Sequence, residues 1–131
     1  MKGFVLDASA ILAYLNDESG KEFVAPALYA GIINAVNVAE VVSKLRDKGL
    51  SEPEAEFEIS GILSQGCKVS AFGHDLAVTT GHLKAMAKLK NLSLGDRACL
   101  ALGMQLGLPI LTADKLWSQL DPELFTIVQI R

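Results

Sequence analysis

The sequence has 131 residues, of which 50% are hydrophobic and 21% are charged, and its formal net charge at pH 7 is −3. A chain of this length buries enough surface to fold as one domain, and its apolar share excludes an intrinsically disordered protein. The small acidic excess argues against broad electrostatic binding to nucleic acid, although a local acidic site can still act on phosphates through bound cations.

Short apolar runs alternate with helical patterns along the chain. In chain order they predict a strand at 3–6, helices at 9–15 and 20–29, a strand at 32–36, helices at 38–48 and 51–65, a strand at 68–72, helices at 74–90 (interrupted at Gly81) and 93–107, a strand at 108–112, a short helix at 113–120 and an edge strand at 125–130. Strands separated by helices imply right-handed crossovers and a mainly parallel sheet covered on both faces. The predicted fold is a three-layer α/β domain with about five strands, and no linker or repeat divides residues 1–131.

The cysteines and the longest uncharged stretches predict a cytoplasmic protein without a membrane span. Cys67 and Cys99 lie in apolar stretches without metal-ligand spacing, which indicates core positions in a reducing compartment, with a disulfide as the alternative. The uncharged stretches 23–39 and 98–113 contain Pro26 and Pro109, and neither reaches the roughly 20 apolar residues that cross a bilayer.

Four acidic residues fall where predicted strands and helices meet. Asp7 directly follows the first strand, Glu40 lies in the first turn after the second, and Asp114 comes two residues after the fourth. Asp96 lies in the first turn of the helix that leads into the fourth strand. Because the carboxyl ends of parallel strands share one edge of the sheet, we expect these four side chains to converge there.

Each of these acids also has an ordinary explanation as a helix cap. The residues that fit a cap are Asn37 with Glu40, Ser93 with Asp96, Thr112 with Asp114, and Asp7 alone. The group as a whole favours a ligand site, since two like charges about 4 Å apart repel by roughly 4 kcal/mol at an effective dielectric constant near 20. Converging carboxylates therefore either take up protons or bind a divalent cation.

A ligand set of carboxylates without His or Cys favours a hard ion, Mg²⁺ or Mn²⁺, over zinc. Such an ion binds phosphates and activates water, so the matching reaction is hydrolysis of a phosphodiester. Ser9 and Thr112 are placed to orient a carboxylate or a bound water, although capping explains both equally well. Arg97 and Lys115 either contact an RNA backbone or are plain solvated residues. The other residues are given ordinary interpretations: Lys44 and Lys48 as plain surface, His74 and His82 as polar helix residues, and Trp117 as a packing residue.

Four segments of the chain resemble, in order, the motifs of PIN domains, specifically those of the VapC toxins of type II toxin–antitoxin modules. The segments are VLDASAIL at 5–12, AVNVAEV at 35–41, LSLGDRACLALG at 92–103 and PILTADKLW at 109–117. By this resemblance the metal-binding catalytic acids are Asp7, Glu40, Asp96 and Asp114, with supporting hydroxyls at Ser9 and Thr112. The resemblance implies an endoribonuclease that depends on Mg²⁺ or Mn²⁺, usually a homodimer, which a VapB-type antitoxin silences by wrapping its C-terminal segment around the toxin.

Other interpretations stay open at this point. A PIN-domain nuclease that processes RNA outside a toxin module would carry the same acids, and a non-catalytic metal- or partner-binding domain would use them only as caps. A metal-ion-dependent adhesion site requires a second serine where Ile11 stands, and a phosphoacceptor receiver domain requires an Asp after the third strand, where Phe72 and Gly73 stand. The pattern of acids allows one bound ion or two.

Overall fold

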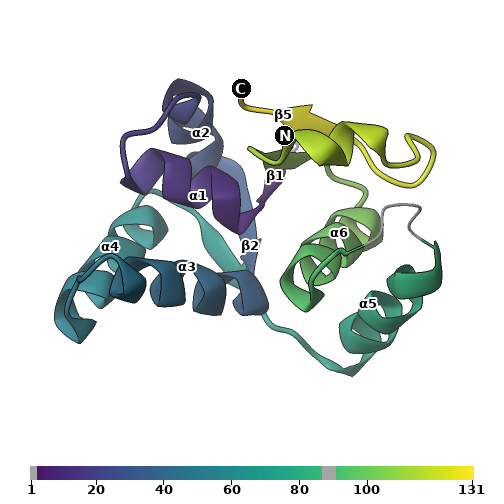
Figure 1. The fold of residues 1–131 in the computed structure, drawn as a ribbon, viewed down its shortest axis with the longest axis horizontal. Helices are drawn as coiled ribbons and strands as arrows, with labels where there is room; N and C mark the ends of the chain where they lie inside the picture. Colours follow the sequence, from purple (N-terminus) through teal and green to yellow (C-terminus); the bar gives the residue numbers. More distant parts are fainter. Residues whose placement is uncertain (1–2, 87–90) are drawn as a thin grey trace.

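The computed structural model describes residues 3–86 and 91–131, and in these two ranges five strands alternate with six α-helices (Figure 1). The strands are β1 (Phe4–Leu6), β2 (Gly31–Asn34), β3 (Lys68–Ser70), β4 (Ile110–Thr112) and β5 (Ile127–Gln129). The helices are α1 (Ala8–Leu15), α2 (Lys21–Ala27), α3 (Ala35–Asp47), α4 (Glu52–Ser64), α5 (His74–Met86) and α6 (Leu94–Leu106), with 3-10 helices η1 (Leu28–Ala30) and η2 (Lys115–Gln119). In the described ranges, none of the helices combines the length and the hydropathy that crossing a membrane requires.

All five strands are parallel and lie in the order β3-β2-β1-β4-β5. The chain builds outward from β1 to β2 and β3, then returns to the other side of β1 to add β4 and β5. The order therefore reverses between β1 and β4, and parallel α/β sheets bind ligands beside the carboxyl ends of the strands at such a point.

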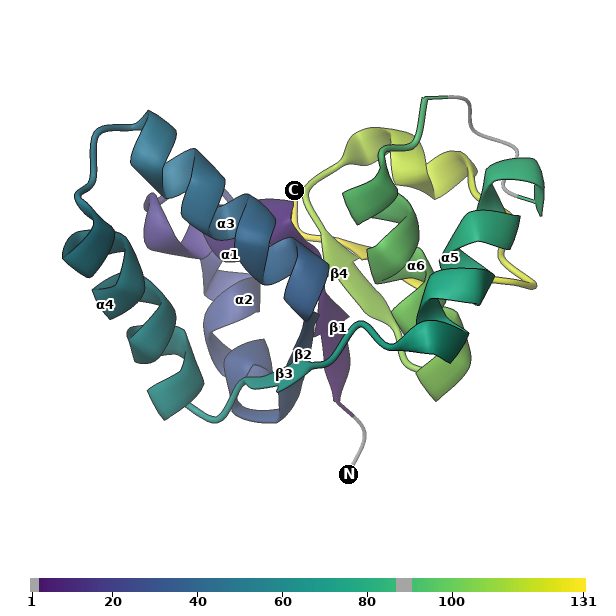
Figure 2. The same ribbon diagram turned by 90° about the horizontal axis from the view of Figure 1, so that it is seen from below.

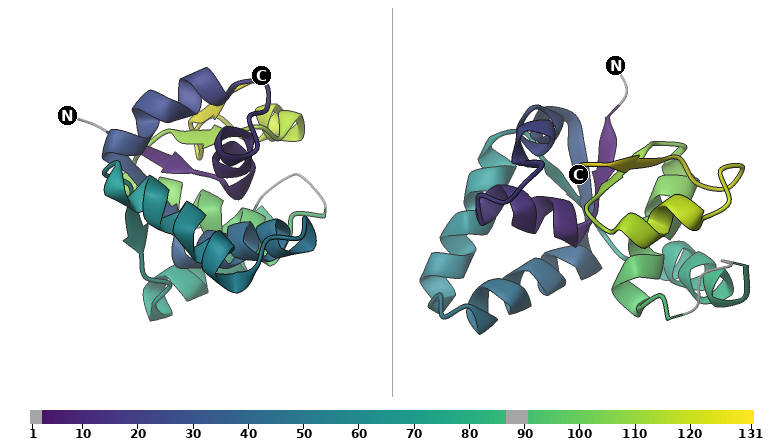
Figure 3. Two further views of the ribbon diagram at one scale, coloured as in Figure 1. Left: turned by 90° about the vertical axis from the view of Figure 1, so that its left-hand side faces the viewer. Right: turned by 45° about the horizontal axis from the view of Figure 1, so that its top comes forward.

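Side chains alternate between the two faces of the sheet and build a separate core on each. Leu6, Ile33 and Leu111 pack in one cluster with residues of α1, α2, α3 and α4. Val5 and Ile110 pack in the other with residues of α5, α6 and η2. Figure 2 shows α1 to α4 on one side of the strands and α5 and α6 on the other, and the right-hand view of Figure 3 also has the strands between them. The predicted three-layer α/β/α fold is confirmed.

The predicted break at Gly81 is wrong, because α5 runs without interruption from His74 to Met86. A side-chain atom added at Gly81 would meet no other atom within 4 Å, so no contact or turn requires a glycine there. Residues 87–90, which complete the predicted helix, lie outside the described residues. The short helix predicted at 113–120 is the 3-10 helix η2.

The start of α3 also differs from the prediction. Asn34 is the N-cap, and its Oδ1 accepts a hydrogen bond of 2.9 Å from the backbone N–H of Val36. Asn37 therefore lies inside the helix, and the capping box predicted for Asn37 and Glu40 is wrong. Asn37 bonds the carboxylate of Glu40 instead, and this contact shapes the site described below.

Both cysteines are buried and free, as predicted for core residues. Burial raises the pKa of the Cys67 thiol to about 11 and that of Cys99 well above its ordinary value. Both side chains are therefore neutral thiols near neutral pH and act as small apolar packing groups.

Candidate functional site

The structure brings all four predicted acids to one cleft of about 170 Å³, which is lined by Asp7, Ala8, Ser9, Leu12, Glu40, Lys44, Asp96 and Asp114. Asp7 follows β1, and Asp114 lies just beyond β4, so these two acids flank the point where the strand order reverses. Glu40 and Asp96 come from the first half of α3 and the first turn of α6. The cleft thus lies where the strand topology predicts a ligand site.

Asp7 is held in the cleft by two hydroxyl groups rather than by a helix terminus. The residue occupies the N-cap position of α1, but its side chain forms no capping bond. Its Oδ2 accepts hydrogen bonds from Ser9 Oγ at 2.6 Å and from Thr112 Oγ1 at 2.9 Å. The backbone N–H of Ala113 donates to Ser9 Oγ at 2.9 Å and fixes that hydroxyl in turn. Thus Ser9 and Thr112 orient the carboxylate, and the capping interpretation of Asp7 does not hold.

The charge of Asp7 is expensive to bury. The side chain is only 4% exposed. Its pKa is raised to about 6, first by burial and then by the negative charges of Asp96 and Glu40, while the hydrogen bonds from Ser9 and Thr112 act in the opposite direction. An ionised carboxylate in such surroundings is stabilised by a nearby cation, which removes both the repulsion and part of the desolvation penalty.

Glu40 is held between α3 and α6 by Asn37, to which the sequence interpretation gave a capping role, and by Gly95, which it did not single out. The side-chain amide of Asn37, which is fully buried, donates to Glu40 Oε1 at 2.7 Å and to the carbonyl of Gly95 at 3.0 Å. A Cβ atom on Gly95 would lie 2.4 Å from the carboxyl carbon of Glu40, so only glycine leaves this space free. A glycine inside a helix lowers the stability of that helix by roughly 0.5–1 kcal/mol relative to alanine, so it is often present because another group approaches the backbone closely. The position of Gly95 inside a predicted helix was the sequence signal for this contact.

Asp96 and Asp114 each act as helix caps, as predicted. Asp96 Oδ2 accepts from the backbone N–H of Ser93 at 3.0 Å, and Ser93 Oγ accepts from the N–H of Asp96 at 3.0 Å, which completes a capping box. Asp114 Oδ1 accepts from the N–H of Leu116 at 3.0 Å at the start of η2, while its own N–H donates to Thr112 Oγ1 at 3.0 Å. Each cap uses a single carboxylate oxygen.

The four carboxylates share one pattern that fits a hard cation. In each, one oxygen is held by a hydrogen bond from the protein, and the other accepts none from residues 3–86 and 91–131. Carboxylate oxygens are the ligands that Mg²⁺ and Mn²⁺ prefer. Over the same two ranges, no three Asp, Glu, His or Cys side chains are arranged around one metal position. Three of these carboxylates would therefore have to move closer together to bind one ion.

The basic residues are placed differently from the sequence interpretation. Arg97 Nη1 donates to the carbonyl of Thr80 at 3.1 Å, so this side chain ties α6 to α5. Lys115 is exposed at the start of η2 and does not line the acidic cleft. Lys44, predicted as plain surface, does line it. The spacing of four residues from Glu40 to Lys44, which puts both on one helix face, was the signal for this contact.

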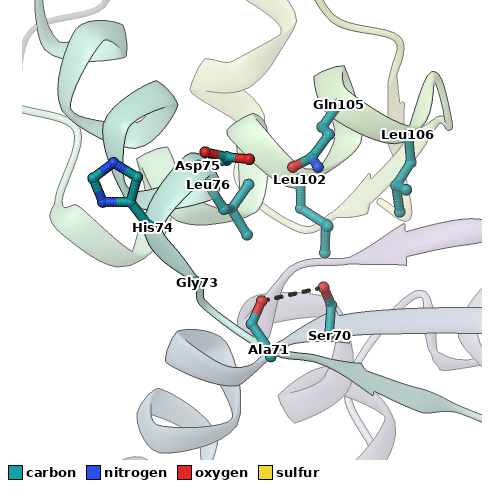
Figure 4. A pocket seen from close by; sticks show the side chains of 9 residues that line it. All are labelled: Ser70, Ala71, Gly73, His74, Asp75, Leu76, Leu102, Gln105 and Leu106. Atoms are coloured by element: carbon teal, nitrogen blue, oxygen red, sulfur yellow. Dashed lines mark hydrogen bonds between the residues drawn. The ribbon is translucent and has the colours of Figure 1, made fainter.

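A separate cavity of about 350 Å³ lies between the end of β3, the start of α5 and the end of α6 (Figure 4). His74 and Asp75 contribute to its lining from α5, and Leu102 and Leu106 from α6. Figure 4 shows the imidazole of His74 on the far side of the cavity from Leu102 and Leu106. None of the four converging acids lines this cavity, so the acidic cleft is the stronger candidate for catalysis.

Comparison with known structures shows the same fold in several toxin–antitoxin proteins. The DNA-bound VapBC of Salmonella typhimurium aligns with a TM-score of 0.77 and 18% identity over 100% of both chains. A toxin–antitoxin complex from Klebsiella pneumoniae gives a TM-score of 0.75 and 16% identity over 98% of each chain. VapC20 of Mycobacterium tuberculosis, a toxin that cleaves the sarcin-ricin loop, gives 0.73 and 17% over 89% of this chain and 94% of that one.

A comparison with models of sequence families gives a match over most of the chain. No curated protein gives a significant match. The family model of the PIN domain matches residues 4–122, a range that includes β1 to β4 and all four acids of the cleft. The chain therefore belongs to the PIN domain family.

Proposed function

We propose that this chain is an endoribonuclease that requires a divalent metal ion, Mg²⁺ or Mn²⁺, and that it is the toxin of a VapBC-type module. One observation carries the proposal: four carboxylates from separate elements line one cleft, and each keeps one oxygen free of protein hydrogen bonds in the described part of the chain. Membership of the PIN family and the similarity to VapC20 support the nuclease and toxin assignments. Residues 1–131 would act as a single nuclease domain.

Each acid has a proposed role in this reaction. Asp7, Glu40 and Asp96 would hold one ion, and Asp114 would complete that site, hold a second ion or position the attacking water. When bound, the ion would lower the pKa of a water molecule beside it and would place a positive charge next to the phosphoryl group. Ser9 and Thr112 keep the Asp7 carboxylate turned so that Oδ1 faces no competing donor from the described residues.

We further propose a VapB-type antitoxin as protein partner, a homodimer as the working assembly and the cytoplasm as its location. The structures from Salmonella typhimurium and Klebsiella pneumoniae are toxin–antitoxin assemblies, which supports the antitoxin. Large apolar side chains on α2, η1 and α4 are exposed, with Phe23 at 59%, Tyr29 at 75% and Phe57 at 77%. Exposed apolar surface of this kind is typical of proteins that bind other proteins.

The test is cleavage of RNA by the purified chain with Mn²⁺, with Mg²⁺ and with EDTA. We expect cleavage with either ion, none with EDTA, and none from Asp7→Asn. Asp75→Asn is a matched control, because Asp75 also lies in the first turn of a helix but does not line the acidic cleft. Cleavage that persists in EDTA or in Asp7→Asn would contradict the proposal, as would an RNA pool left intact by the wild type with both ions.

A further inference from the structure

A second cavity, of about 450 Å³ and distinct from the cavity beside His74, adjoins the acidic cleft. The two share Ser9, Leu12 and Lys44 in their linings, so they lie on either side of these side chains. The remaining lining residues of this second cavity are Asn16, Glu18, Asp47, Lys48 and Arg131. Its walls are α1 and α3, which pack against each other and lie side by side in Figures 1 and 2.

One face of α3 runs through both cavities and changes its charge along the way. Glu40 and Lys44 lie in α3, and Lys48 is its C-cap, with a backbone in the right-handed helical region. The three follow each other at intervals of four residues, and each interval advances about 6 Å along a helix axis and keeps nearly the same face. Glu40 lines the acidic cleft, Lys44 lines both cavities, and Lys48 lines only the second. A row of two positive charges therefore leads away from the carboxylates.

The charges of these two lysines are available to a ligand. Within the described ranges of the chain, neither Lys44 nor Lys48 takes part in an ion pair. Arg131, in contrast, donates to Glu18 Oε1 at 3.3 Å and to the carbonyl of Ser19 at 2.9 Å, so its charge is largely compensated. Asp47 also lines this cavity and offsets part of its positive charge, and Lys44 and Lys48 are the lining cations that form no ion pair with the described residues.

A purely structural explanation accounts for only part of this arrangement. Lysines near the C-terminus of a helix stabilise its dipole, and Lys44 lies in the last turns of α3. Arg46 does the same on a neighbouring face, where it pairs with Glu52 at 3.7 Å. The dipole does not explain why Lys44 lies among four acids. Binding of a polyanion explains this position, because a nucleic acid strand must be held by cations beside an acidic site that otherwise repels it.

We infer that Lys44 and Lys48 form a subsite that binds successive phosphates of single-stranded RNA, next to the phosphate that is cleaved in the acidic cleft. The inference rests on the proposed function for the cleft. Lysine contacts phosphate as a point charge, so the subsite would position the strand without reading its sequence. An acidic peptide is the competing ligand, but the position of the lysines beside a cleft suited to phosphodiester hydrolysis favours RNA.

The test compares the double variant Lys44→Gln/Lys48→Gln with wild type in binding a fluorescent single-stranded oligouridylate. Binding is measured by anisotropy over a series of KCl concentrations in EDTA, where metal-dependent cleavage is stopped. We expect the dissociation constant to rise about five- to twentyfold and the slope of its logarithm against log[KCl] to fall by about 1.4, since each phosphate contact of a single strand contributes roughly 0.7. Both lysines are exposed, so the melting temperature should fall only slightly, through the loss of their interaction with the dipole of α3.

Lys68→Gln/Lys84→Gln is the matched control, because it removes the same charge from exposed positions on β3 and α5 that line neither cavity. Equal affinity and slope for the two double variants would overturn the inference. So would unchanged RNA binding together with weakened binding of a polyglutamate peptide, which would assign the row to an acidic protein segment. RNA cleavage by wild type with Mn²⁺ is scored separately. If it fails while the Lys44/Lys48 variant still binds less RNA, the subsite stands and the proposed nuclease falls.

Discussion

Asp7 and Asp96 line the same cleft but are held in different ways. Asp96 is part of a capping box at the start of α6, where its carboxylate stabilises the helix whether or not an ion is bound. Asp7 is 4% exposed, its side chain forms no capping bond, and among the described residues it is bonded only through Oδ2, by two hydroxyl groups from α1 and β4. The charge of Asp96 stabilises the folded state, whereas the charge of Asp7 destabilises it.

This difference shows that capping and metal binding are not competing explanations for an acid at a strand–helix junction. A cap occupies one carboxylate oxygen, and Asp96 and Asp114 each keep the other oxygen free of protein bonds from the described residues. Asp7 is buried and its side chain caps no helix, so its replacement separates the two roles most clearly.

The largest expected effect is on catalysis. Asp7→Asn should lower metal-dependent RNA hydrolysis at least about 100-fold, because the neutral amide no longer supplies an anionic ligand. Its melting temperature without metal should not fall, since a costly buried charge is removed. Asp96→Ala should lower both the rate of RNA cleavage and the melting temperature. Steady-state RNA cleavage and thermal unfolding measure these effects, and an active but destabilised Asp7→Asn would make Asp7 a structural residue.

The next effect is on the pH dependence of stability without metal. The pKa of Asp7 is about 6 in the folded state against an ordinary value of 3.8, so the folded state keeps a proton that the unfolded state releases between these values. The free energy of unfolding should therefore fall by about 3 kcal/mol as the pH rises from about 4 to about 7. Urea unfolding at a series of pH values in EDTA measures this. Asp7→Asn should remove the decline, and an identical decline in that variant would assign it to other groups.

A smaller effect is expected where Glu40 passes Gly95. Gly95→Ala places a Cβ where the Glu40 carboxylate lies and should weaken Mn²⁺ binding about tenfold, as loss of ligand orientation typically does. Stability should be kept, because the end of a flexible side chain can move aside and alanine favours a helix. Gly61→Ala in α4 is the control, since its added atom meets nothing within 4 Å. Equal Mn²⁺ affinities in calorimetric titrations of the two variants would rule out this role for Gly95.

The smallest effect is expected from the capping boxes. Ser93→Ala and Ser51→Ala each remove the hydroxyl of a complete box, at α6 and α4, and each should lower the free energy of unfolding by about 1 kcal/mol. Only Ser93→Ala should also reduce RNA cleavage, because it removes the acceptor of the Asp96 backbone N–H and so loosens the first turn of α6, which carries Asp96. Denaturant unfolding and cleavage assays on both variants check this, and equal activities would show that the cap does not orient Asp96 for the reaction.

The order of elements and the meeting point of the acids were predictable from sequence. Each apolar run has a clear period, and parallel strands bring their carboxyl ends to one edge, so Asp7 and Asp114 follow from topology alone. The box at Ser93 and Asp96 was predictable because its residue types and spacing match a local hydrogen-bonding pattern.

What the sequence could not supply depends on contacts between distant elements. Asn34 and Asn37 are both good N-caps, and only the end of β2 decides that Asn34 starts α3. The role of Gly95 depends on how closely α3 approaches α6. Val41 and Leu45 are buried, as the amphipathic pattern of this helix indicates, but only the contacts of α3 with α1 and α6 bring the neighbouring Lys44 to the cleft.

The central claim is that these four carboxylates close around a hard divalent ion. The most direct measurement is anomalous diffraction from crystals of the chain grown with Mn²⁺. The account predicts an anomalous peak in the acidic cleft, within about 2.0–2.4 Å of oxygens of Asp7 and at least one of Glu40 and Asp96. A fully occupied Mn²⁺ bound elsewhere, with Asp7 still bonded only by Ser9 and Thr112, would contradict it.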